Sequence, residues 1–482
     1  MRSPPMKRVV GALALVGLVG LYLLVAATAP PFDDEIYYWC WAQHLQLSYF
    51  DHPPMTAYLI RPALVLFGDS ILALRLPAIV TNFVMLGVLA AITRPHSYLL
   101  WAFATPMFTL GAVLITPDTP LLLFWSLYLG WLVIVHRRIA PGPIGGPPRP
   151  VPIWLWLVGG LILGGAGLGK YTAVLLVPSS FLSFMLMGRA YWRRWLPGYI
   201  FHGVIAGLTV TPVLVFNLRY DFAPFLYQWK HANQASRSGI EPFAEFVAVQ
   251  FALIGTGPIV LLPWAWGRLR TLALDPTTRA AVALFVVPLT FFLYKAFRGP
   301  LEGNWAMASY IAFWPVAAWW YARWARTRVR RALAAAAFAI PLALSIVVAV
   351  HLMHPLPFVP PAKDRIGIME VRFAAAARAA HAIRATGEEL PVYAASYQWT
   401  ALLRYNGIDA RQIEGATRPS NFTFTPKHLT DVDRAYVVNE GQLPAHLAPG
   451  FKPPEIVYWE TVTLRGVPVG YAVVLRYERE GK

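Results

Sequence analysis

The stretch VVGALALVGLVGLYLLVAATA (Val9–Ala29), followed at once by PPFDDEIYYW (Pro30–Trp39), decides the fold. About 20 apolar residues are enough to cross the hydrocarbon core of a membrane. Arg2, Lys7 and Arg8 precede the run, as in a signal peptide, but its length and the apolar runs behind it favour a retained helix with its N-terminus inside. The acidic segment that follows is therefore expected outside.

The composition supports a membrane protein. Hydrophobic residues make up 57% of the chain and charged residues 13%, with a mean hydropathy of +0.50, which is too apolar for a water-soluble core. The fold class predicted is an α-helical polytopic membrane protein of about eleven or more spans with a small C-terminal extracytoplasmic α/β domain. The expected spans lie near 9–29, 71–93, 98–115, 119–136, 152–169, 171–187, 198–218, 246–266, 280–297, 304–322 and 332–353.

The distribution of basic residues sets the orientation. The net charge of +17 is not gathered on one soluble face, so nucleic acid is not expected as a partner. With the N-terminus in the cytoplasm, the arginine-rich loops fall inside, in agreement with the positive-inside rule. The inner cations are Arg94, Arg137, Arg138, Arg149, Arg189, Arg193, Arg194, Arg268, Arg270, Arg279, Arg323, Arg326, Arg328, Arg330 and Arg331. The outer segments are Pro30–Ser70, Thr116–Asp118, the turn near Lys170, Arg219–Glu245, Lys295–Gly303 and everything after Leu352.

The polar C-terminal region differs from the rest of the chain. Domain 1–353 is predicted to span the membrane and domain 354–482 to lie outside it. Helical character is expected at Arg372–Ala385, and short strands at Val392–Ala395, Ala435–Val438, Glu455–Leu464 and Gly470–Tyr477.

Nucleotide-binding and cysteine motifs are missing from the sequence. The run Gly164–Lys170 superficially resembles a phosphate-binding loop, but it lies in an apolar span and Tyr171 follows it, so close helix packing is the better interpretation. The single cysteine, Cys40, excludes a disulfide framework and a cysteine zinc site.

Acidic residues gather in the outer segments. Asp33, Asp34 and Glu35 follow the first span and repel one another where the headgroups begin, so they need cations, a hydrated helix cap or a function to retain them. Asp51 lies before His52 in a turn that the following prolines fix in direction. Thr116-Pro117-Asp118-Thr119-Pro120 holds another carboxylate in a short outer loop, where it could also cap the next helix.

Basic residues lie on the same outer side, against the positive-inside bias. Each one calls for a carboxylate or an anionic phosphate as partner, although snorkelling to headgroups is an equal alternative for any single residue. They are Lys170, Lys230, His231, Arg237, Lys295 and Arg298. Carboxylates and cations beside a wall of apolar helices suit a lipid that carries a phosphate-linked sugar: an acid takes a proton from the acceptor hydroxyl while the cations stabilise the leaving phosphate.

These motifs resemble the GT-C superfamily of membrane glycosyltransferases, in particular bacterial relatives of protein O-mannosyltransferases and of the lipid A aminoarabinose transferase. The resemblance runs from about Asp33 to Pro315. It rests on Asp34-Glu35-Ile36-Tyr37-Tyr38, Tyr49-Phe50-Asp51-His52-Pro53-Pro54, Leu66-Phe67-Gly68-Asp69-Ser70 with Leu74-Arg75-Leu76-Pro77, Thr116-Pro117-Asp118, Gly169-Lys170-Tyr171-Thr172-Ala173, Pro212-Val213-Leu214-Val215-Phe216-Asn217 and Asn304-Trp305.

The resemblance implies roles for these residues. The catalytic acid of the first outer loop falls on Asp34, with Glu35 beside it, and the acid of the second loop on Asp118. His52 stands where aminoarabinose transferases have a lysine, so it is expected to be a weaker, pH-dependent phosphate partner. The donor phosphate is assigned to His52, Lys170, Lys230, Arg237, Lys295 and Arg298, and substrate contacts to Asp33, Tyr37, Tyr38, Asp51 and Asn304.

The same resemblance implies a polyprenyl-phosphate sugar donor, inversion at the anomeric carbon, a lipid or protein acceptor and a bacterial inner membrane as the site of action. No cofactor is assigned and a divalent metal stays open, although no ligand set of familiar spacing is present and His351 and His354 are expected at the interface. The main alternatives are a lipid-linked sugar transporter or flippase and a structural scaffold. Against the transporter, the halves show no repeat and the acids gather at one face.

Overall fold

The computed structural model describes residues 4–93, 105–140, 147–233, 237–254, 275–324, 326–424, 428–440 and 447–481. Its contacts divide the chain into two compact units. One comprises Met1–Asp51, Ile60–Leu74 and Val350–Lys482, and the other comprises His52–Leu59 and Arg75–Ala349. The first helix and the first outer segment thus group with the C-terminal region, and the predicted boundary between 353 and 354 stays a prediction about the membrane.

Most of the described chain is helical. The helices are α1 (Pro4–Thr28), α2 (Asp33–Gln43), α3 (Met55–Phe67), α4 (Ile71–Ile92), α6 (Pro106–Gly111), α7 (Asp118–Ile139), α8 (Ile153–Gly169), α9 (Leu176–Met185), α10 (Trp192–Thr209), α11 (Thr211–Arg219), α12 (Ala223–Asn233), α13 (Ile240–Ile254), α16 (Pro276–Arg298), α17 (Met307–Trp324), α18 (Arg328–Met353), α19 (Arg365–Ala385) and α20 (Tyr397–Tyr405). Prolines mark several of the starts: α3 begins just after Pro53-Pro54, and α7 directly after Pro117.

Several helices are long and apolar enough to cross a membrane. Among the described residues, α4, α7, α16 and α18 meet this test, and up to six spans result if two bent pairs of helices each count as one. One bent pair consists of Val16–Thr28 and Asp33–Gln43, which meet at 89°. The predicted total of about eleven spans therefore stays a prediction, and the spans 98–115 and 246–266, with Arg94, Arg268 and Arg270, lie wholly or partly outside the described residues.

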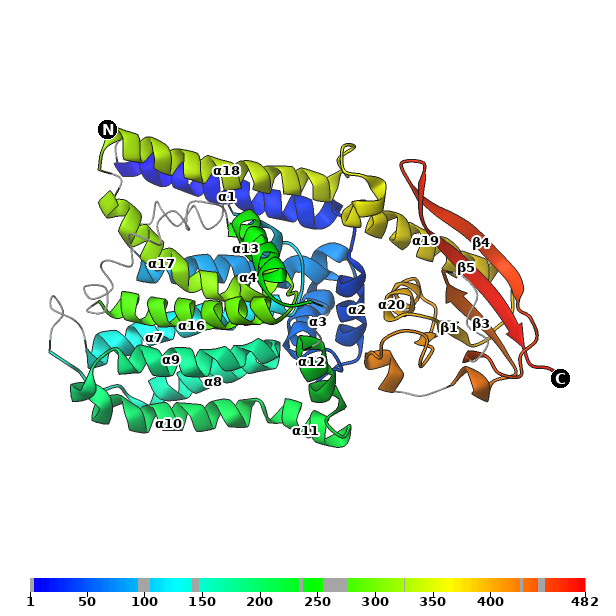
Figure 1. Cartoon of the computed structure of the whole chain (residues 1–482), viewed down its shortest axis with the longest axis horizontal. Helices are drawn as coiled ribbons and strands as arrows, with labels where there is room; N and C mark the ends of the chain where they lie inside the picture. Colours follow the sequence, from blue (N-terminus) through cyan, green and yellow to red (C-terminus); the bar gives the residue numbers. More distant parts are fainter. Residues whose placement is uncertain are drawn as a thin grey trace. The chain divides into compact units, whose positions relative to one another are not determined.

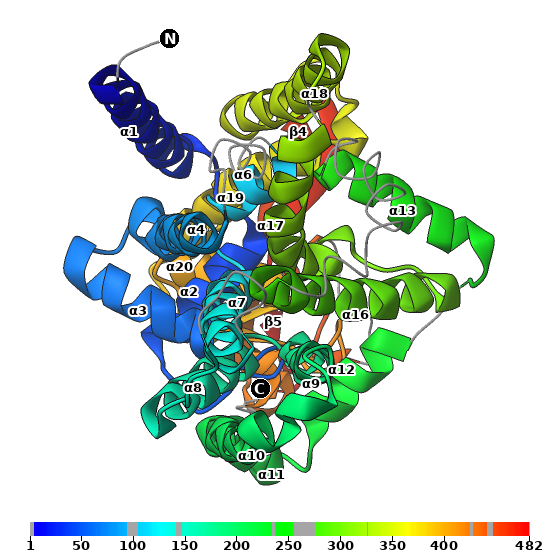
Figure 2. The same cartoon turned by 90° about the vertical axis from the view of Figure 1, so that its left-hand side faces the viewer.

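The unit that contains α7 to α17 is a helical bundle in which α8 packs against both α7 and α10 (Figures 1 and 2). Glycines allow this close approach. A Cβ built on Gly160 would meet the backbone oxygen of His202 at 2.6 Å, and one built on Gly164 would meet the side chain of Thr209 at 2.3 Å. The glycine-rich run at 164–169 is thus a packing surface, as predicted, and not a phosphate loop.

The other unit ends in a five-stranded sheet with strand order β2-β1-β3-β5-β4. Its strands are β1 (Val392–Ala394), β2 (Ala410–Gln412), β3 (Arg434–Asn439), β4 (Glu455–Leu464) and β5 (Val467–Glu478). β1 pairs in parallel with β2 and β3, while β5 pairs antiparallel with β3 and β4. The predicted C-terminal α/β region is confirmed, whereas β2 and the helix α20 were not predicted.

The alanine-rich face of α19 covers β4 and β5 (Figure 1). The β4–β5 hairpin closes through Arg465 and Gly466, both with positive φ, which matches the twist of a two-residue hairpin. The side chain of Arg465 bonds Asp364 at 2.9 Å, at the start of α19, and ties the turn to that helix.

α2 packs against α20 in the same unit. Tyr37 of α2 lies 4.9 Å from Tyr397 of α20 and 5.2 Å from Phe422, measured between ring centroids. One turn further along α2, the Cys40 thiol is buried near the backbone oxygen of Ala401, which also belongs to α20. The C-terminal region thereby positions the first acidic segment.

Candidate functional site

The first turn of α2 separates its three neighbouring acids. Asp33 is buried and accepts a hydrogen bond from Arg372 at 3.0 Å. Glu35 is buried and accepts one from the backbone N–H of Phe32 at 3.1 Å, which caps the helix. Asp34 alone of the three is exposed. Asp34 is therefore the acid of this turn that can reach a substrate, while its neighbours hold the helix in place.

A set of side chains links Asp34 to Asp51. Tyr397 donates its hydroxyl to Asp34 at 2.9 Å, and the guanidinium of Arg418 lies 4.1 Å from the centre of the Tyr397 ring. Arg418 also donates to one oxygen of Asp51 at 2.5 Å. The other oxygen of Asp51 accepts the hydroxyl of Tyr37 at 2.6 Å. We call Asp34, Tyr37, Asp51, Tyr397 and Arg418 the carboxylate network.

The segment after Arg418 fixes the carboxylate network to the backbone. The N–H of Asn421 donates to the Tyr37 oxygen at 2.7 Å. The Asn421 side-chain oxygen in turn accepts the N–H of Phe50 at 3.3 Å. The loop that carries Asp51 and the loop that carries Arg418 are thus joined through main-chain groups, which are less mobile than side chains.

Burial governs the electrostatics of the two linked acids. Burial raises the pKa of Asp34, and the neighbouring Glu35 adds to the rise, while the Tyr397 hydrogen bond and the Arg418 charge act against it. Asp34 as a whole residue is exposed, whereas protein atoms surround its carboxylate, which accounts for the raised pKa. Burial also raises the pKa of Asp51, with Arg418 and Tyr37 opposing the rise. Asp34 therefore takes up a proton at a higher pH than an ordinary aspartate.

The second predicted acid lies in a separate group of contacts. One oxygen of Asp118 forms an ion pair with Lys170 at 2.7 Å, and the other accepts from the side-chain nitrogen of Asn304 at 2.8 Å. These residues begin α7, end α8 and precede α17, so three distant segments converge at one end of the bundle. Asp118 and Lys170 are nearly buried, with side-chain exposures of 7% and 11%. The predicted partnership between outer acids and outer cations holds for this pair.

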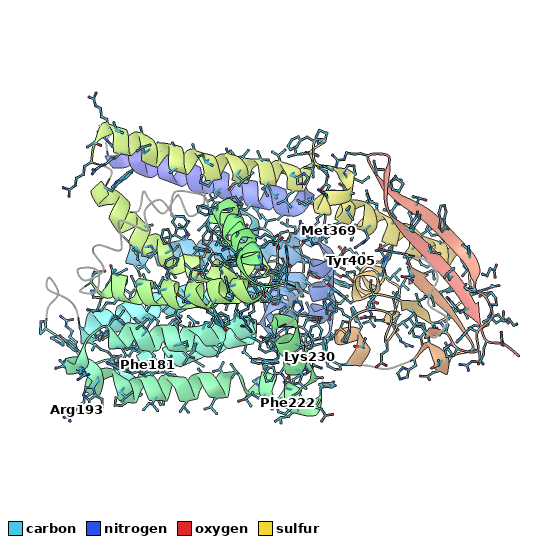
Figure 3. All side chains as sticks on the ribbon, in the orientation of Figure 1. Phe181, Arg193, Phe222, Lys230, Met369 and Tyr405 are labelled. Carbon is cyan, nitrogen blue, oxygen red and sulfur yellow. The ribbon has the colours of Figure 1, made fainter. Side chains whose placement is uncertain are left out.

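The remaining predicted phosphate ligands have varied surroundings. Lys230 is exposed on α12, where Figure 3 labels it. Arg237 is exposed and pairs with Glu241 at 2.9 Å and with Glu245 at 2.6 Å. Lys295 donates to Asn233 at 2.9 Å. Two further candidates complete the set: half-buried His52 and exposed Arg298. Phosphate binding by these side chains stays a prediction.

Four of the predicted substrate contacts are buried. Asp33, Tyr37, Tyr38 and Asp51 have little exposed surface, and three of them are tied up in the hydrogen bonds described above. In this structure they support the neighbouring Asp34, and their contact with substrate stays a prediction. Asn304 is exposed but bonded to Asp118.

Sequence reasoning missed the groups that the C-terminal region contributes. Arg372, Tyr397, Arg418 and Asn421 all bond residues of the first outer segment. The polar run Arg418-Pro419-Ser420-Asn421 was the available signal, since an arginine in a loop is a candidate partner for a carboxylate.

An apolar cavity of about 390 Å³ lies among α8, α9, α10, α11 and α12. Aliphatic and glycine residues line most of it, and its histidine, His202, is bonded through both ring nitrogens, to the Tyr128 hydroxyl and to the Tyr199 backbone oxygen, each at 2.9 Å. The predicted site residues do not line this cavity. The residues that line the cavity suit the apolar chain of a lipid better than a sugar.

Within the part of the chain that the structure describes, no three His, Cys, Asp or Glu side chains are grouped so as to hold a metal ion.

Comparison with known proteins relates this geometry to a class of enzymes. Residues 51–216 match the family model described as dolichyl-phosphate-mannose-protein mannosyltransferase. The lipid A galacturonosyltransferase RgtD of Rhizobium johnstonii is 28% identical over 311 residues, which cover 61% of each chain. The match thus spans about three fifths of the length of that relative.

Solved structures cover nearly the whole chain. ArnT from Cupriavidus metallidurans in the apo state aligns with a TM-score of 0.66 at 16% identity, over 98% of both chains. The same protein bound to undecaprenyl phosphate aligns with a TM-score of 0.66 at 15% identity, over 96% of this chain and 97% of that one. The resemblance to the GT-C membrane glycosyltransferases is therefore confirmed, and the chain has their ArnT-like fold.

Proposed function

We propose that the protein transfers a glycosyl group from a polyprenyl-phosphate donor to a cell-envelope acceptor outside the cytoplasm, with inversion. The observation that carries the proposal is the exposed Asp34, which Tyr397 orients and whose buried neighbours are all engaged, in a chain with an ArnT-like fold. The undecaprenyl phosphate bound to ArnT and the lipid A named as substrate of the relative support this class of donor and acceptor.

The reaction follows from an acid in this position. Asp34 in its ionised form accepts the proton of an acceptor hydroxyl, and the acceptor oxygen attacks the anomeric carbon from the face opposite the phosphate. The bond from the anomeric carbon to the phosphate oxygen breaks, and the polyprenyl phosphate leaves with the electron pair. The outer cations, among them Lys230, stabilise the negative charge of the departing phosphate.

We place the protein in a bacterial inner membrane with a cytoplasmic N-terminus and about eleven spans. The ends of the bundle support this orientation. Arg137 and Arg138 end α7, whereas Asp118 begins it, and 22 helical residues span about 33 Å. Figure 3 places Arg193 at the opposite end of the same unit from Lys230. Along α10, exposed Ile200, Val204 and Leu208 repeat every four residues, which suits a lipid-facing stripe. These three residues of α10 form the apolar face expected of a membrane span.

Transfer can be measured with purified protein in lipid nanodiscs, with polyprenyl-phosphate galacturonate as the first donor tested and lipid A as acceptor. Mass spectrometry detects the added sugar. Asp34→Asn keeps the shape of the side chain but cannot accept the proton, so we expect turnover to fall by about 100-fold or more. Glu455→Gln, which alters an exposed acid paired with Arg476 on the sheet, is the control and should keep full turnover.

Unchanged turnover in Asp34→Asn would show that Asp34 is not the base. If the wild-type protein moved donor across the bilayer of sealed vesicles and formed no glycosylated product with any envelope acceptor, the transferase function itself would be wrong.

A further inference from the structure

Arg418 is a cation that the C-terminal region inserts among acids of the first outer segment. Its guanidinium donates to Asp51 at 2.5 Å and to the backbone oxygen of Pro419 at 3.1 Å, and it lies 4.1 Å from the centre of the Tyr397 ring. Asp51 is buried, and its second oxygen is occupied by Tyr37. Tyr397 is also buried, and its hydroxyl donates a hydrogen bond to Asp34. One side chain thereby fixes two of the groups that surround Asp34.

The charges around Asp34 are mostly negative. From α2 itself come Asp33 and Glu35, and Asp51 follows in the loop beyond α2. Arg372 is bonded to Asp33 and also to Glu440. Arg372 offsets part of this negative charge beside Asp33, and Arg418 offsets part of it beside Asp34 and Asp51.

We propose that Arg418 is a positioning residue of the transfer reaction: its guanidinium holds Asp51 on one edge and the Tyr397 ring on one face, and through both it keeps the Asp34 carboxylate oriented and ionised. This inference rests on the proposed function. It assigns to the C-terminal region a part in the chemistry, because the residue comes from the loop between β2 and β3.

The geometry requires arginine in particular. A planar guanidinium can stack on an aromatic ring with its face while it donates to a carboxylate from its edge. A lysine at the same place keeps the charge but offers a compact ammonium that cannot do both. Charge and shape are therefore separable by substitution.

The test is the pH dependence of turnover in variants of the full-length protein in nanodiscs. Burial places the acid limb of the wild-type profile above the pH at which an ordinary aspartate loses its proton, since Asp34 must be ionised to act. Arg418→Gln removes the opposing charge, so the limb should move to higher pH by about one unit, with turnover about tenfold lower on the acidic side. Asp51→Asn removes a negative neighbour and keeps Arg418, so the limb should move to lower pH.

Arg418→Lys separates the two roles. The limb should stay near the wild-type position because the charge remains, while the plateau falls because the stacking on Tyr397 is lost. The control is Arg378→Gln, which breaks another arginine–carboxylate pair of the same unit, with Glu460 at 2.6 Å, and should change neither limb nor plateau. Thermal unfolding midpoints confirm that each variant is folded.

A purely structural role would lower turnover in Arg418→Gln without moving the limb, and that result would overturn the proposal. Limbs that moved in the same direction in Arg418→Gln and Asp51→Asn would overturn it as well. The proposed function is tested separately: if Asp34→Asn retained turnover, Asp34 would not be the base, whatever Arg418 does. If Asp34→Asn were inactive and the Arg418 variants had wild-type profiles, only the role of Arg418 would be wrong.

Discussion

The contact between Asp118 and Lys170 allows a quantitative prediction. Both side chains are nearly buried, and their charged atoms are 2.7 Å apart. Lys170→Met leaves the Asp118 carboxylate buried with the neutral amide of Asn304 but without its cation. Removing one partner of a buried pair costs about 3–5 kcal/mol. The unfolding entropy of a chain of 482 residues is about 1 kcal/mol/K, so the unfolding midpoint should fall by about 3–5 °C.

The double variant Asp118→Asn with Lys170→Met decides whether the pair is coupled. It removes both charges together, and replacement of a whole buried pair is often close to neutral. We expect its loss of stability to be at least about 2 kcal/mol smaller than the sum of the two single losses. Thermal unfolding of purified protein in one detergent, followed by circular dichroism, gives the four midpoints of the cycle.

An exposed pair in the same unit provides the control. Arg237 and Glu241 have side-chain exposures of 41% and 70%, so Arg237→Met should lower the unfolding midpoint far less than Lys170→Met does. Additive losses for Asp118→Asn and Lys170→Met would refute the reasoning, because two independent side chains would then explain the data. A loss in Lys170→Met no larger than in the control would refute it equally.

Two further predictions concern packing and orientation. Gly164→Ala puts a Cβ within 2.3 Å of a threonine side chain on α10 and should cost about 1–3 kcal/mol, whereas Gly203→Ala, which meets open space, should leave the unfolding midpoint unchanged or slightly raised. In a Cys40→Ala background, the variants Arg193→Cys and Lys230→Cys should react with a membrane-impermeant maleimide from opposite sides of oriented vesicles; labelling of both from the same side would contradict the orientation.

Local features of the sequence were enough to predict many elements. The strand predicted at Glu455–Leu464 matches β4 residue for residue, and the expected helix at 280–297 lies within α16. The period of the hydrophobic residues, the turn residues and the prolines each act over a few neighbouring positions. These features can therefore be recognised directly in the sequence. The strand predicted at Val392–Ala395 matches β1 except for its last residue, whereas the three-residue strand β2 was not predicted, because a segment so short acquires its pairing from a partner elsewhere in the chain.

The carboxylate network required more than local patterns. Sequence alone placed Asp33, Asp34 and Glu35 side by side in an outer segment and pointed to Asp34 through a family resemblance. Each step along a helix turns the side chain by about 100°, so the three acids face different surroundings. Which one is exposed depends on what packs against α2, and that surface is built by residues more than 300 positions later, such as Arg372 and Tyr397.

By itself the sequence determined the apolar helices and the small C-terminal α/β region, because hydrophobicity and turn chemistry are properties of short segments. Only the tertiary structure decided that Asp118 meets Lys170 and Asn304, and that Arg418 meets Asp51. The physical reason is that an ion pair in a buried place forms only where packing brings its two members within a few ångströms, and packing is settled by the whole chain.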